Sequence, residues 1–290
     1  MSKIIQVENV SFRYKHGAQL ALKDVSFSVR AGEFIGITGP AGAGKTTLLS
    51  CINGIIPHYY GGEYQGRVLV DGLEVAQSNF RELAGHVGTV FEDPDFQMVS
   101  ISVEEEVAFG PENLGIPSEE IERRIQLALE KTRISQLRER AISTLSGGQK
   151  QRVAISAMLS MLPKVILLDD PTSELDPIGT HEVFTALVEL NRQAGITVIV
   201  VSQNIERLVE NANRILLLSE GELVLSGTPR EICLQKQVLE SAGVRVPQVV
   251  EYTLALYSRL GYPLVMDDLP LTVDQAVPVL RKIFSQAGVP

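Results

Sequence analysis

The feature that most constrains this chain is a glycine-rich loop between a short apolar segment and the start of a helix. Residues 33–38 are mostly apolar and predict a short buried strand, and residues 46–49 predict the first turn of a helix. Between them lie the fixed positions of the pattern G-x-x-x-x-G-K-[ST], at Gly39, Gly44, Lys45 and Thr46. Strand, loop and helix in this order predict a phosphate-binding loop in an α/β fold.

The chemistry of such a loop assigns roles to its residues. Its backbone N–H groups turn inward around a phosphate, and the helix N-terminus adds positive potential. Lys45 is expected to reach the β- and γ-phosphates, and the Thr46 hydroxyl to ligate Mg²⁺. A glycine-rich turn that carries Lys-Thr by chance is the alternative, which the flanking segments disfavour. The residues expected to bind ATP here are Gly39, Pro40, Ala41, Gly42, Ala43, Gly44, Lys45, Thr46 and Thr47.

An acidic residue follows a second apolar run. Residues 165–168 suit a strand that is buried on both faces of a parallel sheet. Asp169 would lie at the carboxyl end of that strand, where ligands bind in open α/β sheets. We expect Asp169 to hold Mg²⁺ through water. The alternative is a turn-forming aspartate before Pro171, which the phosphate loop upstream disfavours.

A third motif lies about a hundred residues after the phosphate loop, at Leu145, Ser146, Gly147, Gly148 and Gln149. Ser146 is expected to cap the helix that follows. The two glycines permit a close backbone approach to a phosphate, toward which the positive end of this helix would point. A capped helix start without any ligand is the alternative.

Over roughly residues 1–230 the chain resembles the ATP-binding subunit of an ABC (ATP-binding cassette) transporter. The resemblance identifies residues 39–46 as Walker A, 91–97 as the Q-loop region, 145–149 as the signature and 165–169 as Walker B. It adds a switch-loop strand at residues 198–203. It also implies that Ser173 and Asp176 belong to the D-loop and that Tyr14 stacks on adenine. ATP and Mg²⁺ are the implied cofactors.

In this family each ATP lies between the Walker A of one cassette and the signature of the other, so the signature acts in trans. A narrower resemblance, to the ATPases of energy-coupling factor (ECF) importers of vitamins and transition-metal ions, rests on residues 91–97, 103–111, 243–247 and 270–276. Residues 56–62 resemble the first cassette of tandem ECF ATPases. These resemblances imply a motor subunit at the cytoplasmic face of the membrane, whose partners are a second ABC ATPase and membrane-spanning subunits.

The sequence departs from the family pattern at three positions on the γ-phosphate side of its own Walker site. Asp170 replaces the glutamate that polarises the attacking water, and a misplacement of about 1 Å can cost about a hundredfold in rate. Gln203 replaces the switch histidine and cannot carry positive charge. Glu92 replaces the Q-loop glutamine; it can ligate Mg²⁺, but it adds negative charge beside the reacting phosphate.

We therefore expect a site that binds ATP but hydrolyses it slowly, in a heterodimer whose partner holds the competent site. A homodimer with reduced turnover is the alternative. A regulatory ATP-binding subunit with negligible turnover is a second function class. A soluble, non-transport ABC ATPase is a third, but repair-type relatives carry a long coiled coil before the signature, and translation factors usually carry two cassettes per chain.

Composition limits the partners. The net charge is −9, which gives no support to a nucleic-acid role. No apolar run approaches the about 18 residues of a membrane span, so transport would need membrane proteins on other chains. The two cysteines, Cys51 and Cys233, fit a reduced, cytosolic compartment.

The organisation expected is an ABC domain over residues 1–232, with a helical insert at about 95–162, and an extension over residues 233–290. The core sheet should be mostly parallel, beside an antiparallel β subdomain.

In the helical insert, Ser118 should cap a helix that buries Ile121, Ile125 and Leu129. In the family this side of the insert receives a coupling helix of the membrane subunit. Four residues suit either that role or a local core: Phe96, Met98, Val99 and Phe109.

The extension shows two helical patterns. The first is an apolar stripe formed by Val249, Thr253, Leu256 and Leu260. The second is a capping box at Thr272 and Gln275, after which Pro278 should kink or shorten the helix. The extension could pack on its own cassette or form a dimer contact, and the sequence leaves both open.

Overall fold

The computed structural model describes residues 2–173, 175–261 and 266–286, which fold around two β-sheets. An antiparallel sheet has the strand order β2-β1-β4-β5, and a six-stranded sheet has the order β10-β9-β3-β8-β7-β6. The strands are β1 (Lys3–Tyr14), β2 (Leu22–Arg30), β3 (Phe34–Thr38), β4 (Gly62–Val70), β5 (Leu73–Glu74), β6 (Val87–Val90), β7 (Val165–Asp169), β8 (Thr197–Val201), β9 (Arg214–Ser219) and β10 (Glu222–Gly227).

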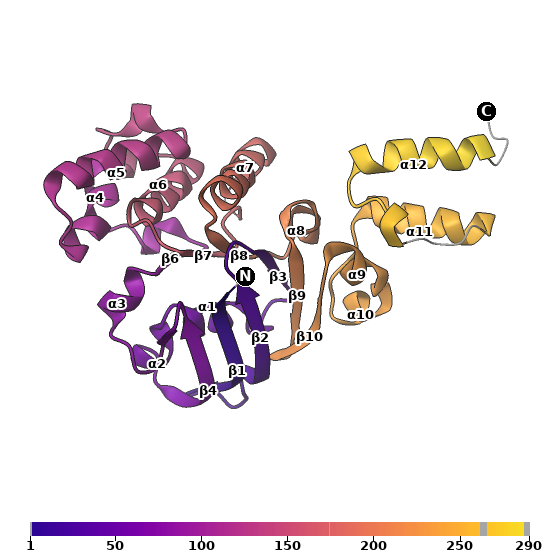
Figure 1. Cartoon of the computed structure of the whole chain (residues 1–290), viewed down its shortest axis with the longest axis horizontal. Helices are drawn as coiled ribbons and strands as arrows, with labels where there is room; N and C mark the ends of the chain where they lie inside the picture. Colours follow the sequence, from indigo (N-terminus) through magenta and orange to yellow (C-terminus); the bar gives the residue numbers. More distant parts are fainter. Residues whose placement is uncertain (1, 174, 262–265, 287–290) are drawn as a thin grey trace.

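The helices fall into three groups in space (Figure 1). Those near the sheets are α1 (Lys45–Ile52), α2 (Ile55–His58), α3 (Phe80–Ala84), α7 (Pro177–Ala194) and α8 (Ile205–Asn211). The helical insert holds α4 (Val103–Leu114), α5 (Ser118–Lys131) and α6 (Gly147–Ser160). The extension holds α10 (Lys236–Ser241), α11 (Gln248–Leu260) and α12 (Val273–Gln286), and α9 (Pro229–Leu234) leads into it.

The six-stranded sheet is mostly parallel and buried, as predicted. β3 pairs in parallel with β8 and β9, and β7 pairs in parallel with β6 and β8. Every residue of β3, β7 and β8 is buried, because apolar clusters cover both faces. Val201 pairs with both Ile37 and Asp169, so the loops after β3, β7 and β8 meet at one edge of the sheet.

The two apolar clusters use opposite faces of the same strands. Ile35 and Ile37 pack with the antiparallel sheet and α1, whereas Phe34 packs with the insert and the extension. This alternation follows from the two-residue period of a strand. Cys51 lies in the first cluster and Cys233 in the second, and burial raises the pKa of each thiol to about 12.

Two tight turns join neighbouring antiparallel strands, at Asp71-Gly72 and at Glu220-Gly221. Both residues of each pair have a positive φ, between 50° and 84°, as tight hairpins of this type require. The first turn joins β4 to β5 and the second joins β9 to β10. Asp71 also binds Lys164, which precedes β7, at 2.6 Å and so ties the antiparallel sheet to the core sheet.

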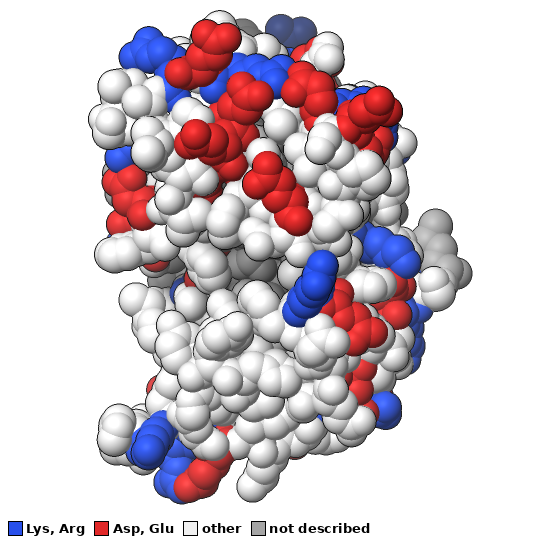
Figure 2. Space-filling model, turned by 90° about the vertical axis from the view of Figure 1, so that its left-hand side faces the viewer, with Lys and Arg blue, Asp and Glu red and all other residues white. Residues whose placement is uncertain are grey.

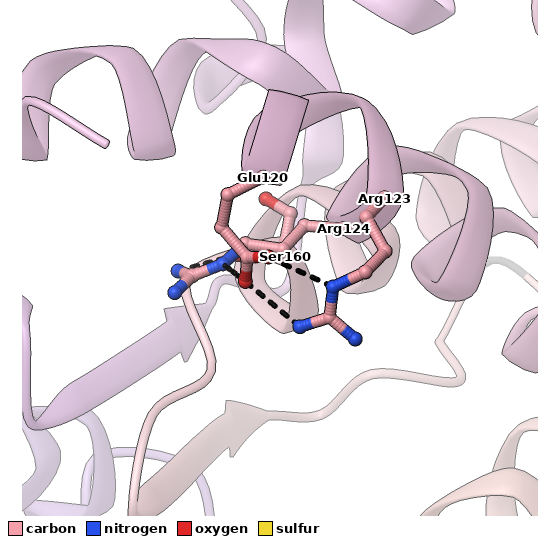
Figure 3. Close-up of polar contacts among 4 residues, drawn as sticks. All are labelled: Glu120, Arg123, Arg124 and Ser160. Carbon is pink, nitrogen blue, oxygen red and sulfur yellow. Dashed lines mark hydrogen bonds and ion pairs between the residues drawn. The ribbon is translucent and has the colours of Figure 1, made fainter. Parts of the chain in front are cut away.

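In the insert, α5 buries Ile121, Ile125 and Leu129, as predicted. The prediction of Ser118 as its cap is wrong: Ser118 is the first helical residue, and the N-cap is Pro117, whose extended conformation starts the helix one residue earlier. Figure 3 shows Arg124 between Glu120, which its Nε contacts at 2.8 Å, and the carbonyl of Ser160 near the end of α6. Arg124 thereby ties α5 to the signature helix.

The extension begins on the cassette and ends away from it. Leu239, Val244 and Val250 belong to the same apolar cluster as the core sheet and the insert. In Figure 1, α11 and α12 run side by side and project from the rest of the molecule. The first part therefore packs on its own cassette, while a dimer contact through α11 and α12 stays a prediction, as does the domain boundary at residue 232.

Details of both extension helices differ from the predictions. α11 buries Val250, Thr253 and Tyr257, so the predicted stripe is wrong at its end, where Leu260 is 39% exposed. Gln275 N donates to Thr272 Oγ1 at 3.3 Å, but the Gln275 side chain accepts from Leu271 N. The predicted shortening at Pro278 is wrong, because the helix continues through Pro278 to Gln286, while a kink there stays a prediction.

Candidate functional site

The phosphate loop has a backbone that only glycine can form at two positions. A Cβ on Gly39, where φ is +147°, would lie 2.0 Å from the carbonyl oxygen of Leu218. At Gly44, where φ is +97°, it would lie 2.4 Å from the carbonyl oxygen of Ala21. Gly44 is the N-cap of α1 and makes no side-chain capping bond. The first N–H groups of α1 therefore have no capping side chain and can bind an anion.

Lys45 is buried inside the loop, and three carboxylates surround its charge. Its Nζ donates to the carbonyl oxygens of Gly39 at 2.9 Å and Pro40 at 2.7 Å. Burial lowers the pKa of Lys45, while the charges of Asp169, Asp170 and Glu92 oppose that shift. The structure thus brings together the predicted lysine, the Walker B aspartate and two of the altered positions.

Asp169 and Thr46 form the pair predicted to hold a metal ion. Asp169 is 6% exposed at the end of β7. Burial raises its pKa, against a hydrogen bond with Thr46 and the charge of Lys45. A carboxylate and a hydroxyl in contact are oxygen donors that fit Mg²⁺, and the Glu92 carboxylate acts on the same Lys45. Bound there with ATP, Mg²⁺ would offset phosphate charge.

Asp170 is held by the switch segment. It has a left-handed backbone, with φ +41°, and its N–H donates to the carbonyl oxygen of Val201. Burial raises the pKa of Asp170, while hydrogen bonds from the Gln203 backbone N–H and the Ser202 hydroxyl oppose the shift. The sequence did not point to Ser202, because its role depends on β7 and β8 lying side by side. Gln203 and Glu92 are both exposed at this edge.

Tyr14 lies against the first turn of the phosphate-loop helix. Its hydroxyl is 3.0 Å from Thr47 Oγ1, and its ring meets Phe12 edge to face, with centroids 4.8 Å apart. Tyr60 meets the same ring at 6.0 Å. Tyr14 is thus beside the loop, where the predicted contact with a base requires it. The contact of Tyr60 had no signal in the sequence.

The signature forms a capped helix start in an open hollow. Ser146 and Gln149 make a capping box in which Gln149 N donates to Ser146 Oγ and Ser146 N donates to Gln149 Oε1. Leu145 is 7% exposed and anchors the segment, whereas Ser146 and Gly147 are exposed. A Cβ on Gly148 would lie 2.8 Å from Leu175 Cδ2, so this glycine also lets the helix pack on the D-loop.

The D-loop residues connect the two regions along the chain. Ser173 N donates to the carbonyl oxygen of Asp170 at 3.2 Å. Asp176 caps α7 through a bond from Gly179 N, and it lines the signature hollow, which has a volume of about 500 Å³. Within the described part of the chain, no phosphate-loop residue lines that hollow. The phosphate loop and the signature therefore lie at two separate places on this chain.

A protein-family model described as "ABC transporter" matches residues 22–173. The chain belongs to this family. A putative ABC transporter ATP-binding protein of Pyrococcus abyssi is 45% identical over 256 residues, covering 88% of this chain and 91% of the relative. The energy-coupling factor transporter ATP-binding protein EcfA1 of Caldanaerobacter subterraneus subsp. tengcongensis is 41% identical over 255 residues, covering 87% of this chain and 90% of the relative.

A solved structure gives the same family. CbiO1 from Clostridium perfringens, described as part of the ABC transporter complex CbiONQ, matches with a TM-score of 0.74 and 35% identity. The match covers 88% of this chain and 100% of CbiO1. The predicted P-loop cassette fold is thereby confirmed, and the cassette's general activity is that of an ABC ATPase of a transporter, which binds nucleotide. Among the described residues, no helix is long and apolar enough to cross a membrane.

One face of the cassette exposes apolar side chains near the Q-loop. Phe96 is 90% exposed, Val99 66% and Phe109 48%, whereas Met98 is partly buried in the core. Buried Glu106 accepts hydrogen bonds from the N–H groups of Val99 and Ser100, which fixes the loop. Figure 2 shows that the face turned toward the viewer carries many charged side chains, acidic ones above all, in its upper part and a largely uncharged surface below them.

Proposed function

We propose that this cassette is the ATP-driven motor subunit of an ECF-type importer and that its own Walker site hydrolyses ATP slowly. The proposal of slow hydrolysis rests on one observation: the Walker site carries altered residues, whereas the signature of the same chain is intact. Asp170, Gln203 and Glu92 all lie around the buried Lys45 or on the switch segment beside it. The signature keeps its full sequence and its capping box in a separate hollow.

The residues of the Walker site divide the work between binding and hydrolysis. The N–H groups of the loop and Lys45 would hold the phosphates, and Thr46 and Asp169 would hold Mg²⁺. Asp170 would orient water, but its carboxylate is already engaged by the Gln203 N–H and the Ser202 hydroxyl. The neutral Gln203 side chain adds no positive charge as negative charge develops in the transition state.

The separate signature hollow supports a dimer in which residues 145–149 act on ATP that is bound by another cassette. The capped N-terminus of α6 would then contribute to the γ-phosphate of the partner. Because this chain's Walker site is the altered one, we favour a heterodimer with a partner that keeps Gln, Glu and His at the corresponding positions. A homodimer would combine two altered sites.

The importer class rests on relatives and on one surface. EcfA1 is named for an energy-coupling factor transporter, and CbiO1 is described as part of a transporter complex. The exposed residues Phe96, Val99 and Phe109 would suit a helix from a membrane-spanning subunit. On this proposal the cassette lies peripherally at the cytoplasmic face of the membrane.

Single-turnover hydrolysis tests the catalytic part of the proposal. We expect the purified chain to bind MgATP and to hydrolyse it slowly without a partner, and faster turnover when a partner cassette is added. Vigorous hydrolysis by the chain alone would contradict the slow site. Negligible turnover even with a partner would favour a regulatory subunit, a role that the three altered residues also support. Co-purification with membrane proteins would distinguish the motor and regulatory roles from that of a soluble, non-transport ATPase.

A further inference from the structure

An open hollow connects the phosphate loop with the extension. Its volume is about 450 Å³. Gly39 and Pro40 line one side together with Gln203, and the segment from Gly243 to Glu251 lines the other. A Cβ built on Gly243 would be in ordinary van der Waals contact with Pro40 Cβ, at 4.0 Å. The extension therefore borders the start of the phosphate loop and the altered switch position.

The local sequence presents one arginine to this hollow. Val244 and Val246 are each 6% exposed and belong to the apolar cluster that includes the core sheet. Arg245 between them is exposed and lines the hollow. Two buried neighbours fix the backbone on both sides, so the core sets the position of the Arg245 Cα while the side chain is exposed.

The charges around Arg245 leave its guanidinium available. The acidic side chains of this hollow are Glu206 and Glu251. The Glu251 carboxylate is bound by Lys236 Nζ at 2.6 Å, and this bond is the largest cause that lowers the pKa of Glu251, with Arg245 a lesser one. Among the side chains that the structure describes, no carboxylate lies within ion-pair distance of Arg245, and no other basic residue lines this hollow.

We infer that Arg245 binds the terminal phosphate of the ATP held by the phosphate loop of the same chain, and supplies positive charge beside the neutral Gln203. This inference rests on the proposed function, since it requires ATP in that loop. Guanidinium donors match phosphate oxygens in geometry and charge. The extension thereby distinguishes ATP from ADP, because Arg245 binds the γ-phosphate, which ADP lacks.

The test compares MgATP with MgADP by titration calorimetry at 4 °C, using the full-length chain. Arg245→Ala should weaken MgATP binding about tenfold, the effect of one lost charge-assisted contact, and change MgADP binding by less than about twofold. Arg245→Lys should retain part of the ATP affinity. The matched control is Arg259→Ala, which removes an exposed arginine on α11 that does not line this hollow. The control should change neither affinity.

Equal losses for MgATP and MgADP, or no loss for either, would overturn the inference. A loss of ATP affinity that depended on protein concentration would also overturn it, in favour of a contact between subunits. The wild-type affinity for MgATP tests the proposed function separately. A failure of that function shows in the wild-type chain, whereas a failure of the Arg245 inference shows only in the ratio of ATP to ADP affinities among the variants.

Discussion

The phosphate loop and the signature are both glycine-rich segments at the N-terminus of a helix, yet they use that position differently. α1 begins without a side-chain cap and with a buried lysine, whereas Ser146 and Gln149 cap α6 within the chain itself. The first site is built around charge, since three carboxylates and an ammonium group meet there. The second lies in a hollow lined by Arg133, Arg152 and Asp176. The three positions that differ from the family pattern all belong to the first site.

Replacing Lys45 should have the largest effect on MgATP affinity and should distinguish the phosphate loop from the signature most clearly. Lys45→Ala deletes the buried ammonium group, and charge-assisted contacts of this kind contribute roughly tenfold to hundredfold in affinity. We expect the MgATP affinity of the isolated chain, measured by calorimetry, to fall by at least about tenfold. Ser146→Ala should leave the same affinity unchanged. Equal losses in the two variants would show that both regions bind ATP in one chain.

The signature is tested by turnover with a partner cassette. Ser146→Ala should lower the hydrolysis rate of the mixed assembly by about tenfold or more, because a donor directed at developing charge is lost. The matched control is Ser102→Ala, since Ser102 makes the same kind of capping box with Glu105 at the start of α4. A similar fall in both variants would mean that only a helix cap matters.

Restoring two family residues should raise the hydrolysis rate at the phosphate-loop site. We expect the double variant Asp170→Glu with Gln203→His to hydrolyse ATP about tenfold faster than the wild-type chain in single turnover, because it restores the longer carboxylate and a side chain that can be cationic. Its MgATP affinity should stay within about twofold. An unchanged rate would indicate that these two residues do not limit hydrolysis.

The smallest effect concerns the pH dependence of stability. Burial raises the pKa of Asp170 in the folded chain above the ordinary value of 3.8. The protonated form is therefore favoured on folding, and a stability cost develops as pH rises through the ordinary pKa and is complete above the folded one. Asp170→Asn removes that cost.

Melting temperatures of wild type and Asp170→Asn measure this effect. The gain of the variant should grow from near zero at about pH 3.5 to about 2 °C at pH 7. Asp176→Asn is a control, because Asp176 is an exposed aspartate in the same region of the sequence, where it caps α7. A gain that is largest at low pH would reverse the sign and contradict the burial of this carboxylate.

Local patterns in the sequence predicted several strands and helices that the structure contains. The phosphate loop, the buried strand before Asp169 and the cap at Ser146 depend on neighbouring residues, so short-range chemistry suffices to find them. One prediction failed where tertiary packing decides, at the buried face of α11. Another failed for a local reason, at the start of α5, where Pro117 rather than Ser118 is the N-cap.

The sequence by itself determined which residues can bind phosphate, because glycine, lysine and hydroxyl side chains at fixed spacing have few other uses. It also determined that three positions lack the family's usual side chains. Only the tertiary structure decided which groups meet. The parallel register of β3, β7 and β8 places Lys45, Asp170 and Ser202 at one edge, and packing of the extension brings Arg245 to the same loop. These contacts join residues that are far apart in the chain, and they depend on packing that no local sequence pattern encodes.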